Sequence, residues 1–311
     1  MASLKEIKTR LTSVKNTLKI TSAMKMVSSA KLHKAQAAIE GKLPYEKKLH
    51  HILGGMLRDD DLNKALHKEF GFGGNGHSSL VLQDVAADAL PSRESTGRVA
   101  IVAFSSNSSL CGAFNANVIK KFRETVSLLE SKGYSKKDID IYTVGRKIAE
   151  AARKDGFVLE GDYPEMADKP SYEEAEELAI LLVDRFTASE VGQVILVYSH
   201  FNSTASQVPV RENYLPLALH ENEEDAEPVD YILEPDPLSI VRTLLPQVLM
   251  MKIYTVLLDS NASEHAARTV AMQIASDNAK DLISDLTLAY NKGRQSQITS
   301  EILDLVGGSL N

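Results

Sequence analysis

The sequence predicts an α/β protein in which long N- and C-terminal helices pair as an antiparallel coiled coil around a central domain with a mostly parallel sheet. Three observations support this fold class. Residues 2–40 contain neither glycine nor proline, and apolar side chains recur there at heptad spacing. Apolar β-type runs alternate with helical patterns over residues 98–200. Residues 237–306 read as helix, interrupted by Pro246 and Gly293.

The N-terminal segment, residues 1–57, is predicted to be a coiled-coil helix. Five apolar residues with steps of three and four positions form its first two heptads: Leu4, Ile7, Leu11, Val14 and Leu18. The apolar positions then drift to Ile20, Met24 and Val27, and later to Leu32, Ala35 and Ile39. Gly41 and Pro44 predict an interruption, after which residues 45–57 resume the helix.

Residues 58–97 have the composition of a flexible insertion. They contain three consecutive aspartates and the glycine-rich run GFGGNGHSS at 71–79. That run follows no predicted strand and precedes no predicted helix. It therefore lacks the context of a dinucleotide-binding loop.

Residues 98–235 are predicted to form a Rossmann-like α/β domain. The strands are expected at 98–104, 138–144 and 193–199, and the helices at 113–133, 146–156 and 171–189. Ser171 is suited to cap the last helix, with acidic residues in the following turn. Strands that alternate with helices favour a parallel sheet with right-handed crossovers, and residues 208–217 predict an additional edge strand.

Residues 236–311 are predicted to be the second coiled-coil helix. Asp236 suits the N-cap and Pro237 the first helical position, while Gly307 and Gly308 end the helix. Pro246 is expected to kink it or to mark a join. At about 1.5 Å per residue such a rod is on the order of 100 Å long. No single core can cover it, so it needs a partner helix or a sleeve of other subunits.

Composition and charge narrow the possible classes of protein. Of 311 residues, 43% are hydrophobic, and the single cysteine, Cys111, excludes an intrachain disulfide. The start MASLKEIKTR lacks the apolar region of a secretory signal, and no run approaches ~20 uncharged apolar residues. We therefore expect no membrane span, although docking on a membrane complex remains open.

The net charge of −7 hides an asymmetry between segments. Residues 1–57 hold eleven Lys and Arg against three acids, whereas residues 221–236 hold eight acids and no base. A basic end suits an acidic partner, nucleic acid or an anionic surface, and a solvated helix face is the alternative.

The familiar catalytic motifs are absent from the sequence. GxSxG, HExxH, CxxC and the Walker A motif do not occur, and the histidines at 33, 50, 51 and 67 have no metal-ligand spacing. Residues 105–117 follow a predicted strand and open a helix, where α/β proteins bind anions. Their Ser and Asn side chains could meet a phosphate, or could cap a helix and shape a turn, and we favour the second reading. We expect no catalytic, cofactor-binding or metal-binding residue, and Cys111 is predicted to be a small buried side chain.

The C-terminal helix carries a polar patch at residues 291–299. Arg294, Gln295 and Thr299 project over about one and a half turns, and Gln295 and Thr299 share a face. An arginine and an amide suit hydrogen bonds to an outside partner, with a solvated face as the alternative. Several alanines before the patch allow close approach of a second helix: Ala266, Ala267, Ala271, Ala275 and Ala279.

With these residues the chain resembles the gamma subunit family of bacterial F-type ATP synthases. The resemblance covers residues 6–36 and 263–308, together with SLCGAFNANV at 109–118, SQVPV at 206–210 and EPDP at 234–237. The 59–97 insertion lies outside it. Asn107-Ser108-Ser109 stands where the family commonly has Asp-Arg-Gly, which argues against a charge role for that loop.

The resemblance implies a central rotor shaft that is not itself catalytic. Its partners would be three alpha and three beta subunits, an epsilon subunit and a membrane c ring, without nucleic acid. Its location would be the cytoplasmic face of the bacterial inner membrane. Rotation would couple proton flow through the c ring to ATP synthesis or hydrolysis at the beta subunits.

The resemblance also assigns contact residues. Arg294, Gln295 and Thr299 would meet a beta-subunit loop, with Met24 beside them across the coil. An apolar bearing at the end of the shaft would comprise Leu303, Leu305 and Val306, and a foot on the c ring would comprise Tyr231 and Glu234.

Two other functions compete with this one. The first is a nucleotide-binding α/β enzyme with helical arms, which depends on the 105–117 loop. The second is a nucleic-acid-binding coiled coil, which depends on the basic N-terminal helix. The lack of interleaved aromatic residues in residues 1–40 and the acidic whole-chain charge count against the second.

Overall fold

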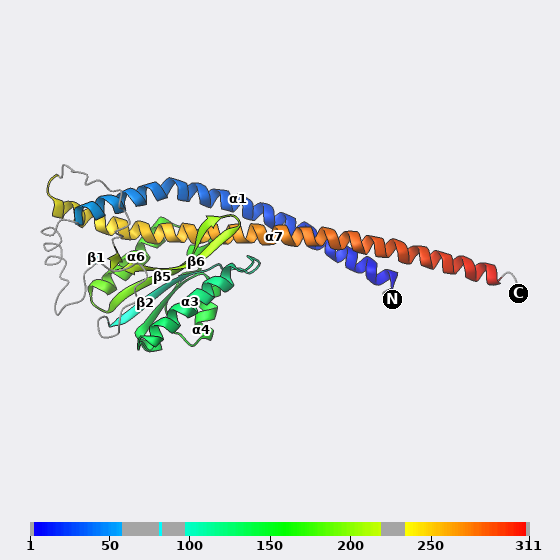
Figure 1. Cartoon of the computed structure of the whole chain (residues 1–311), viewed down its shortest axis with the longest axis horizontal. Coiled ribbons are helices and arrows are strands. Elements are labelled where there is room, and N and C mark those ends of the chain that lie inside the picture. Colours follow the sequence, from blue (N-terminus) through cyan, green and yellow to red (C-terminus); the bar gives the residue numbers. More distant parts are fainter. Residues whose placement is uncertain (1–2, 58–80, 83–96, 219–233, 309–311) are drawn as a thin grey trace. The chain divides into compact units, whose positions relative to one another are not determined.

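The computed structural model describes residues 3–57, 81–82, 97–218 and 234–308, in two compact units (Figure 1). The coil unit comprises Met1–Ala30 and Arg268–Asn311, and the sheet unit comprises Lys31–Ala267. The predicted insertion at 58–97 lies almost entirely outside the described residues. The predicted division into four segments stays a prediction.

The N-terminal helix α1 runs without a break over Leu4–Leu57. The predicted interruption at Gly41 and Pro44 is therefore wrong. Pro44 removes one backbone hydrogen bond, but Leu49 and Leu53, one to three turns later, are buried in the core of the sheet unit. Burial of the flanking turns outweighs the local preference for a break.

The C-terminal helix α7 runs over Pro237–Gly308 and contains both Pro246 and Gly293, so neither residue interrupts it. Its start is as predicted: Asp236 accepts hydrogen bonds from the Ser239 amide (2.9 Å) and hydroxyl (2.7 Å), and Pro237 is the first helical residue. Its end at Gly308 also agrees with the prediction.

The sheet unit contains a five-stranded sheet in the order β4-β3-β2-β5-β6. Its strands are β2 (Arg98–Phe104), β3 (Ile139–Val144), β4 (Leu159–Asp162), β5 (Val191–Ser203) and β6 (Ser206–Leu215). The first four strands in this spatial order are parallel, and β6 pairs antiparallel with β5 at the edge. The mostly parallel sheet and the edge strand are confirmed. A separate pair of two-residue strands joins β1 (Val81–Leu82) to β7 (Leu217–Ala218).

Strand β4 and the short helix α5 (Pro164–Asp168) were not predicted. The four residues of β4, Leu-Glu-Gly-Asp, lie at the sheet edge and alternate between half-buried and exposed. So short and polar a strand has no periodic signal of its own. These residues form a strand because they pair with β3.

Helices cover both faces of the sheet (Figure 1). One face packs against α3 (Phe114–Ser131) and α4 (Arg146–Lys154). The one-turn helix η1 (Lys136–Asp138) lies between α3 and β3 in the chain. The other packs against α6 (Tyr172–Thr187), the first part of α7 and the end of α1. Side chains of β2 alternate between these two cores, so the strand reads as a continuous apolar run.

Among the residues that the structure describes, one helix is long and apolar enough to cross a membrane by length and composition. It is α7, whose best window has a mean hydropathy of 1.4 and is 50% buried within the molecule. Core helices pass the same test, and α7 buries Val241, Val248 and Ile253 against the sheet.

Candidate functional site

The candidate site is the surface of the two paired helices in the coil unit. The α1 residues at heptad spacing, here called the seam, continue in phase after Leu18. They pass through Thr21, Lys25 and Ser28, of which Thr21 and Ser28 are buried. In the sheet unit the same steps reach the buried Leu32 and Ala35. The predicted drift to Ile20 and Val27 is wrong, because both side chains are more than half exposed.

The register of the antiparallel pair follows from two contacts. The Ser276 hydroxyl donates a buried hydrogen bond of 2.8 Å to the Thr21 hydroxyl. At Gly293 an added Cβ would lie 3.0 Å from the Leu4 side chain. Seventeen residues forward along α1, from Leu4 to Thr21, match seventeen residues backward along α7, from Gly293 to Ser276. The helices therefore pair in one continuous register.

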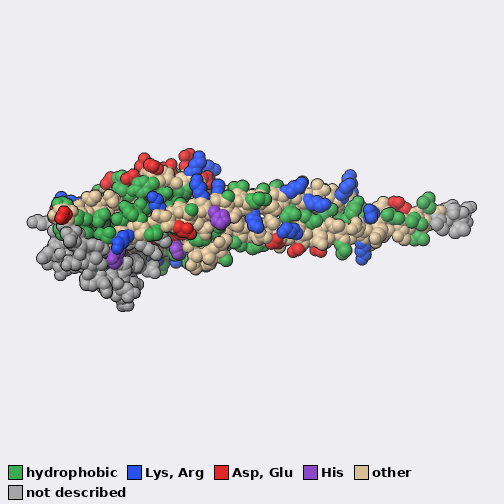
Figure 2. Space-filling view, turned by 90° about the horizontal axis from the view of Figure 1, so that it is seen from above, with side chains coloured by type: hydrophobic (Ala, Val, Ile, Leu, Met, Phe, Trp, Pro, Cys, Tyr) green, Lys and Arg blue, Asp and Glu red, His purple; other side chains and the backbone are tan. Residues whose placement is uncertain are grey.

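The outward surface of the coil unit is mixed apolar and basic. Along the paired segments, residues 4–30 of α1 and 268–293 of α7, six large apolar side chains off the seam are more than half exposed: Ile20, Met26, Val27, Ile274, Leu282 and Leu288. Exposed Lys and Arg side chains of α1 lie between them, and Figure 2 shows blue and green side chains interspersed along the paired helices. Exposed apolar groups at this density are typical of a surface that contacts other proteins.

The polar patch lies where α1 begins. Leu4 contacts α7 at Gly293, so Arg294, Gln295 and Thr299 follow on α7 directly beyond the first turn of α1. All three side chains are exposed. The Thr299 hydroxyl donates to the Gln295 carbonyl at 2.9 Å.

Met24 does not lie beside this patch, so that expectation is wrong. In the observed register Met24 is level with Gln273, about six turns of α7 away from Arg294. It is half-buried, and Lys25 is close enough to Asp277 to influence its carboxylate. Hydrogen bonds from Gln273 and Lys280 hold the pKa of Asp277 below its ordinary value of 3.8. Position in the sequence could not reveal this distance, because it depends on how the two helices are staggered.

The predicted bearing lies in the last turns of α7. The side chains of Leu303 and Leu305 are 65% and 74% exposed, as is expected of apolar groups in a surface that contacts another protein. Val306 belongs to the same helix, and its side chain lies outside the described residues.

The predicted foot is described only in part. Tyr231 lies outside the described residues, and Glu234 is exposed just before α7. Next to it, the Ser239 hydroxyl and amide hold the pKa of Asp236 below its ordinary value of 3.8. An ionised cap therefore anchors the start of α7 at neutral pH.

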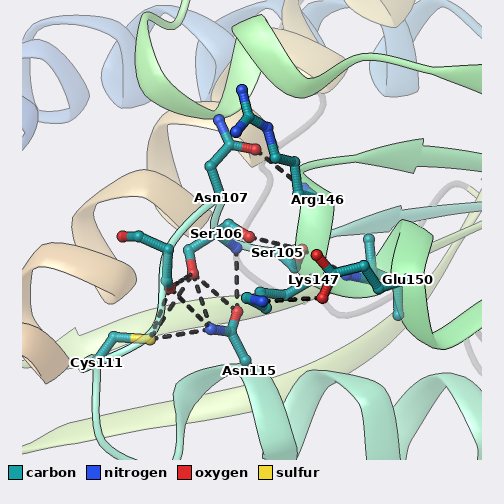
Figure 3. A network of polar contacts seen from close by, with 10 residues as sticks. Ser105, Ser106, Asn107, Cys111, Asn115, Arg146, Lys147 and Glu150 are labelled. Atoms are coloured by element: carbon teal, nitrogen blue, oxygen red, sulfur yellow. Dashed lines mark hydrogen bonds and ion pairs between the residues drawn. The ribbon is translucent and has the colours of Figure 1, made fainter.

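The loop after β2, the basis of the competing enzyme function, is occupied by its own side chains (Figure 3). The first three amides of α4 are all bonded to it. The Arg146 amide donates to Asn107 Oδ1 (2.9 Å), the Lys147 amide to the Ser106 carbonyl (3.2 Å) and the Ile148 amide to Ser105 Oγ (2.9 Å). An anion bound at this helix start would have to displace these groups.

The rest of the loop is held in the same way. Asn115 accepts from the Ser106 amide (3.1 Å), and its own amide donates to Cys111 Sγ (3.1 Å). Asn107 Nδ2 donates to the Pro164 carbonyl (2.6 Å) and to Asp168 (2.7 Å). The loop's side chains thus cap a helix, as predicted, but the helix is α4 and not α3, whose N-cap residue Ala113 makes no side-chain capping hydrogen bond. The predicted burial of Cys111 is confirmed. The described residues also contain no group of three or more His, Cys, Asp or Glu side chains placed to hold a metal ion.

Comparisons with known proteins agree with this geometry. The family model for ATP synthase matches residues 3–310. The ATP synthase gamma chains of Phocaeicola vulgatus and Bacteroides fragilis are 54% and 52% identical to the chain, each over 100% of both proteins. A chain of the Euglena gracilis mitochondrial ATP synthase matches with a TM-score of 0.61 at 20% identity, covering 99% of this chain and 93% of that one. A chain of the Tetrahymena thermophila mitochondrial ATP synthase, from a structure of its central stalk and c ring, matches with a TM-score of 0.57 at 21% identity, covering 83% of this chain and 99% of that one. At these identities the two structures show a shared fold.

Proposed function

Because the chain belongs to the ATP synthase gamma chain family and forms the central stalk of an F-type rotor, we propose that its paired helices transmit rotation between a membrane c ring and the catalytic beta subunits. It is a stalk subunit rather than the catalytic subunit. The main supporting observation is the coil unit, in which the seam residues are buried or half-buried between two helices while apolar and basic side chains are exposed.

Such a surface suits a shaft inside a ring of three alpha and three beta subunits. The exposed groups differ from one side of the coil to the other, so rotation changes the contacts that each beta subunit receives. The basic side chains of α1 suit acidic loops of the beta subunits. The modest apolar content suits contacts that must form and release.

Specific contacts are assigned by motif. Arg294, Gln295 and Thr299 contact a beta-subunit loop, and Met24 forms a second contact about six turns away rather than part of the same one. The bearing is formed by Leu303, Leu305 and Val306. Tyr231 and Glu234 meet the c ring, with the epsilon subunit bound alongside.

The chain is a component of the membrane-bound ATP synthase complex. The bacterial relatives support the cytoplasmic face of the inner membrane as its location, where it is held peripherally through the c ring.

The test compares two variants in a bacterial strain that lacks its own gamma subunit. Arg294→Ala with Gln295→Ala removes directional hydrogen bonds, whereas deletion of residues 303–311 removes a diffuse apolar contact. Since hydrogen bonds of charged groups contribute about 1.5–3 kcal/mol each, the double variant should lower ATP-driven proton pumping at least about tenfold and the deletion less than about threefold.

Pumping is measured in inverted membrane vesicles at equal amounts of assembled complex. The control variant Asn117→Ala with Lys137→Ala removes an exposed amide and an exposed cation from the sheet unit and should pump normally. Equal losses from the double variant and the deletion would refute the assignment of the patch as the main contact.

A further inference from the structure

A row of polar contacts fastens helix α7 to the β5–β6 hairpin within the sheet unit. Four α7 residues carry them: Leu249, Lys252, Asp259 and Ser263. Their spacing of three, seven and four positions places them on one stripe of the helix. Apolar side chains such as Val256 and Ile253 fill the core beside this stripe.

The centre of the row is a cluster of one ammonium and two carboxylates. Lys252 Nζ lies 2.7 Å from Glu212 of β6 and 3.7 Å from Glu46 of α1. The Tyr198 hydroxyl of β5 donates to Glu212 at 2.9 Å. Lys252 thereby joins both terminal helices to the edge of the sheet.

Lys252 carries a positive charge, and the cluster holds one ammonium for two carboxyl groups. Burial alone would lower the pKa of the Lys252 ammonium, but Glu212 and Glu46 reverse the effect and raise it. Burial also raises the pKa of Glu46 against the attraction of Lys252. Lys252 is the cation that both carboxylates contact, so removal of Lys252 leaves each of them without this ion pair.

Four further contacts extend the row in both directions. Asp259 accepts from the Phe201 amide (2.8 Å) and pairs with His200 Nδ1 (2.6 Å). The buried Ser263 hydroxyl donates to the Ser199 carbonyl at 2.8 Å. At the other end, the buried Tyr214 hydroxyl donates to the Leu249 carbonyl at 3.1 Å.

We propose that this row is the joint through which the α/β domain and the shaft helix α7 exchange torque, with Lys252 as its main positioning residue. The inference rests on the proposed function, in which the chain transmits rotation between the c ring and the beta subunits.

Polar contacts suit a joint that transmits torque because hydrogen bonds and ion pairs depend on direction. Apolar contacts are non-directional, so packed apolar surfaces resist separation far better than they resist sliding. A slide by one residue moves a helix about 1.5 Å along its axis, which breaks hydrogen bonds of ordinary length. Polar contacts at four successive levels, of which those of Lys252 and Asp259 are charge-assisted, therefore oppose both sliding and rotation of α7 against the sheet.

The main test uses a variant that neutralises the cluster without leaving a buried charge: Glu46→Gln, Lys252→Met and Glu212→Gln together. The complex is reconstituted in inverted vesicles, and the ratio of ATP-driven proton pumping to ATP hydrolysis is measured. Slippage at the joint lets hydrolysis continue while pumping fails, so the ratio should fall at least about threefold. A decrease in stability alone would lower both rates together and leave the ratio unchanged.

Two controls accompany this variant. Arg123→Met with Asp155→Asn removes a bidentate ion pair of the same unit (2.7 and 2.9 Å) that does not involve α7, and its ratio should equal that of the unmodified complex. Lys252→Arg keeps a cation between the two carboxylates. Its ratio of pumping to hydrolysis should stay close to that of the unmodified complex.

A second, milder variant keeps the inference testable should the triple variant fail to assemble. Tyr214→Phe with Ser263→Ala removes two neutral contacts of the row at nearly constant volume, and it should lower the ratio in the same direction by a smaller factor. A normal ratio in every assembled joint variant would overturn the inference. Loss of pumping in the unmodified complex would instead contradict the proposed function.

Discussion

At the residue scale, Gly145 shows how one backbone conformation organises the loop after β2. It precedes α4 with φ of +104°, a region that residues with a Cβ rarely adopt. An added Cβ would overlap the Ser105 carbonyl oxygen. The absence of that atom lets the loop approach closely enough for Ser105 Oγ to cap α4. The same approach fills the place where an anion would otherwise bind.

Gly145→Ala should therefore destabilise the sheet unit by at least about 3 kcal/mol, since backbone strain and a steric overlap act together. Gly156→Ala is the matched control. It also has a positive φ, of 87°, but the nearest atom to its Cβ would be Lys136 Nζ at 3.8 Å. Strain alone should cost about 1–2 kcal/mol there. Urea unfolding of the purified variants, followed by circular dichroism, measures both, and equal losses would contradict the role of the close approach.

At the scale of the element, the seam of α1 keeps heptad spacing while its chemistry changes. Leu4 to Leu18 are apolar, whereas Thr21, Lys25 and Ser28 are polar. The Ser276 hydroxyl donates to Thr21, whose own hydroxyl donates to the Leu18 carbonyl at 3.2 Å. A polar pair in a seam costs stability but disfavours other registers, because a shifted register would bury its hydroxyls without partners.

A double-mutant cycle tests this role of the polar pair. Thr21→Val leaves the Ser276 donor without its acceptor and should lower the free energy of local opening by about 0.5–1.5 kcal/mol. Ser276→Ala should cost less, because Thr21 keeps its bond to Leu18. The two changes together should be nearly neutral, since an apolar pair needs no partner. Hydrogen exchange of the α7 amides near residue 276 measures each value, and strictly additive losses would contradict the pairing.

At the scale of the whole molecule, stability is distributed unevenly. The central strands β2 and β5 of the sheet unit are almost fully buried along most of their length. In the coil unit, most side chains of α7 after Ala279 are exposed. Segments with few buried contacts open at low free energy, which suits a surface that becomes covered only by partner subunits.

Hydrogen exchange on the purified chain should therefore show at least about 100-fold greater protection for β2 and β5 than for α7 beyond Gly293. Within α7, amides of the buried part near Ile253 serve as the internal control for helical hydrogen bonding. Uniform protection from Pro237 to the end of α7 would contradict the expectation. So would an exposed end that is as protected as the sheet.

Local and periodic information in the sequence was sufficient for much of this architecture. The apolar runs located β2, β3 and β5, Ser171 located the start of α6, and Asp236-Pro237 located the start of α7. The motifs at both ends indicated the family, which full-length relatives confirm. These features depend on residues close together along the chain, whose preferences act before any tertiary contact forms.

Only the tertiary structure decided what depends on distant residues. The helices continue through Pro44 and Pro246, and the short polar strand β4 pairs with β3. Met24 and Arg294 lie about six helical turns apart. The tertiary structure also brought Glu46, Glu212 and Lys252 together, although no periodicity relates them. The sequence by itself thus determined which segments are helix or strand and which family they compose. Helix stagger and charge pairing were decided by packing, because burial and long-range contacts outweigh local propensity.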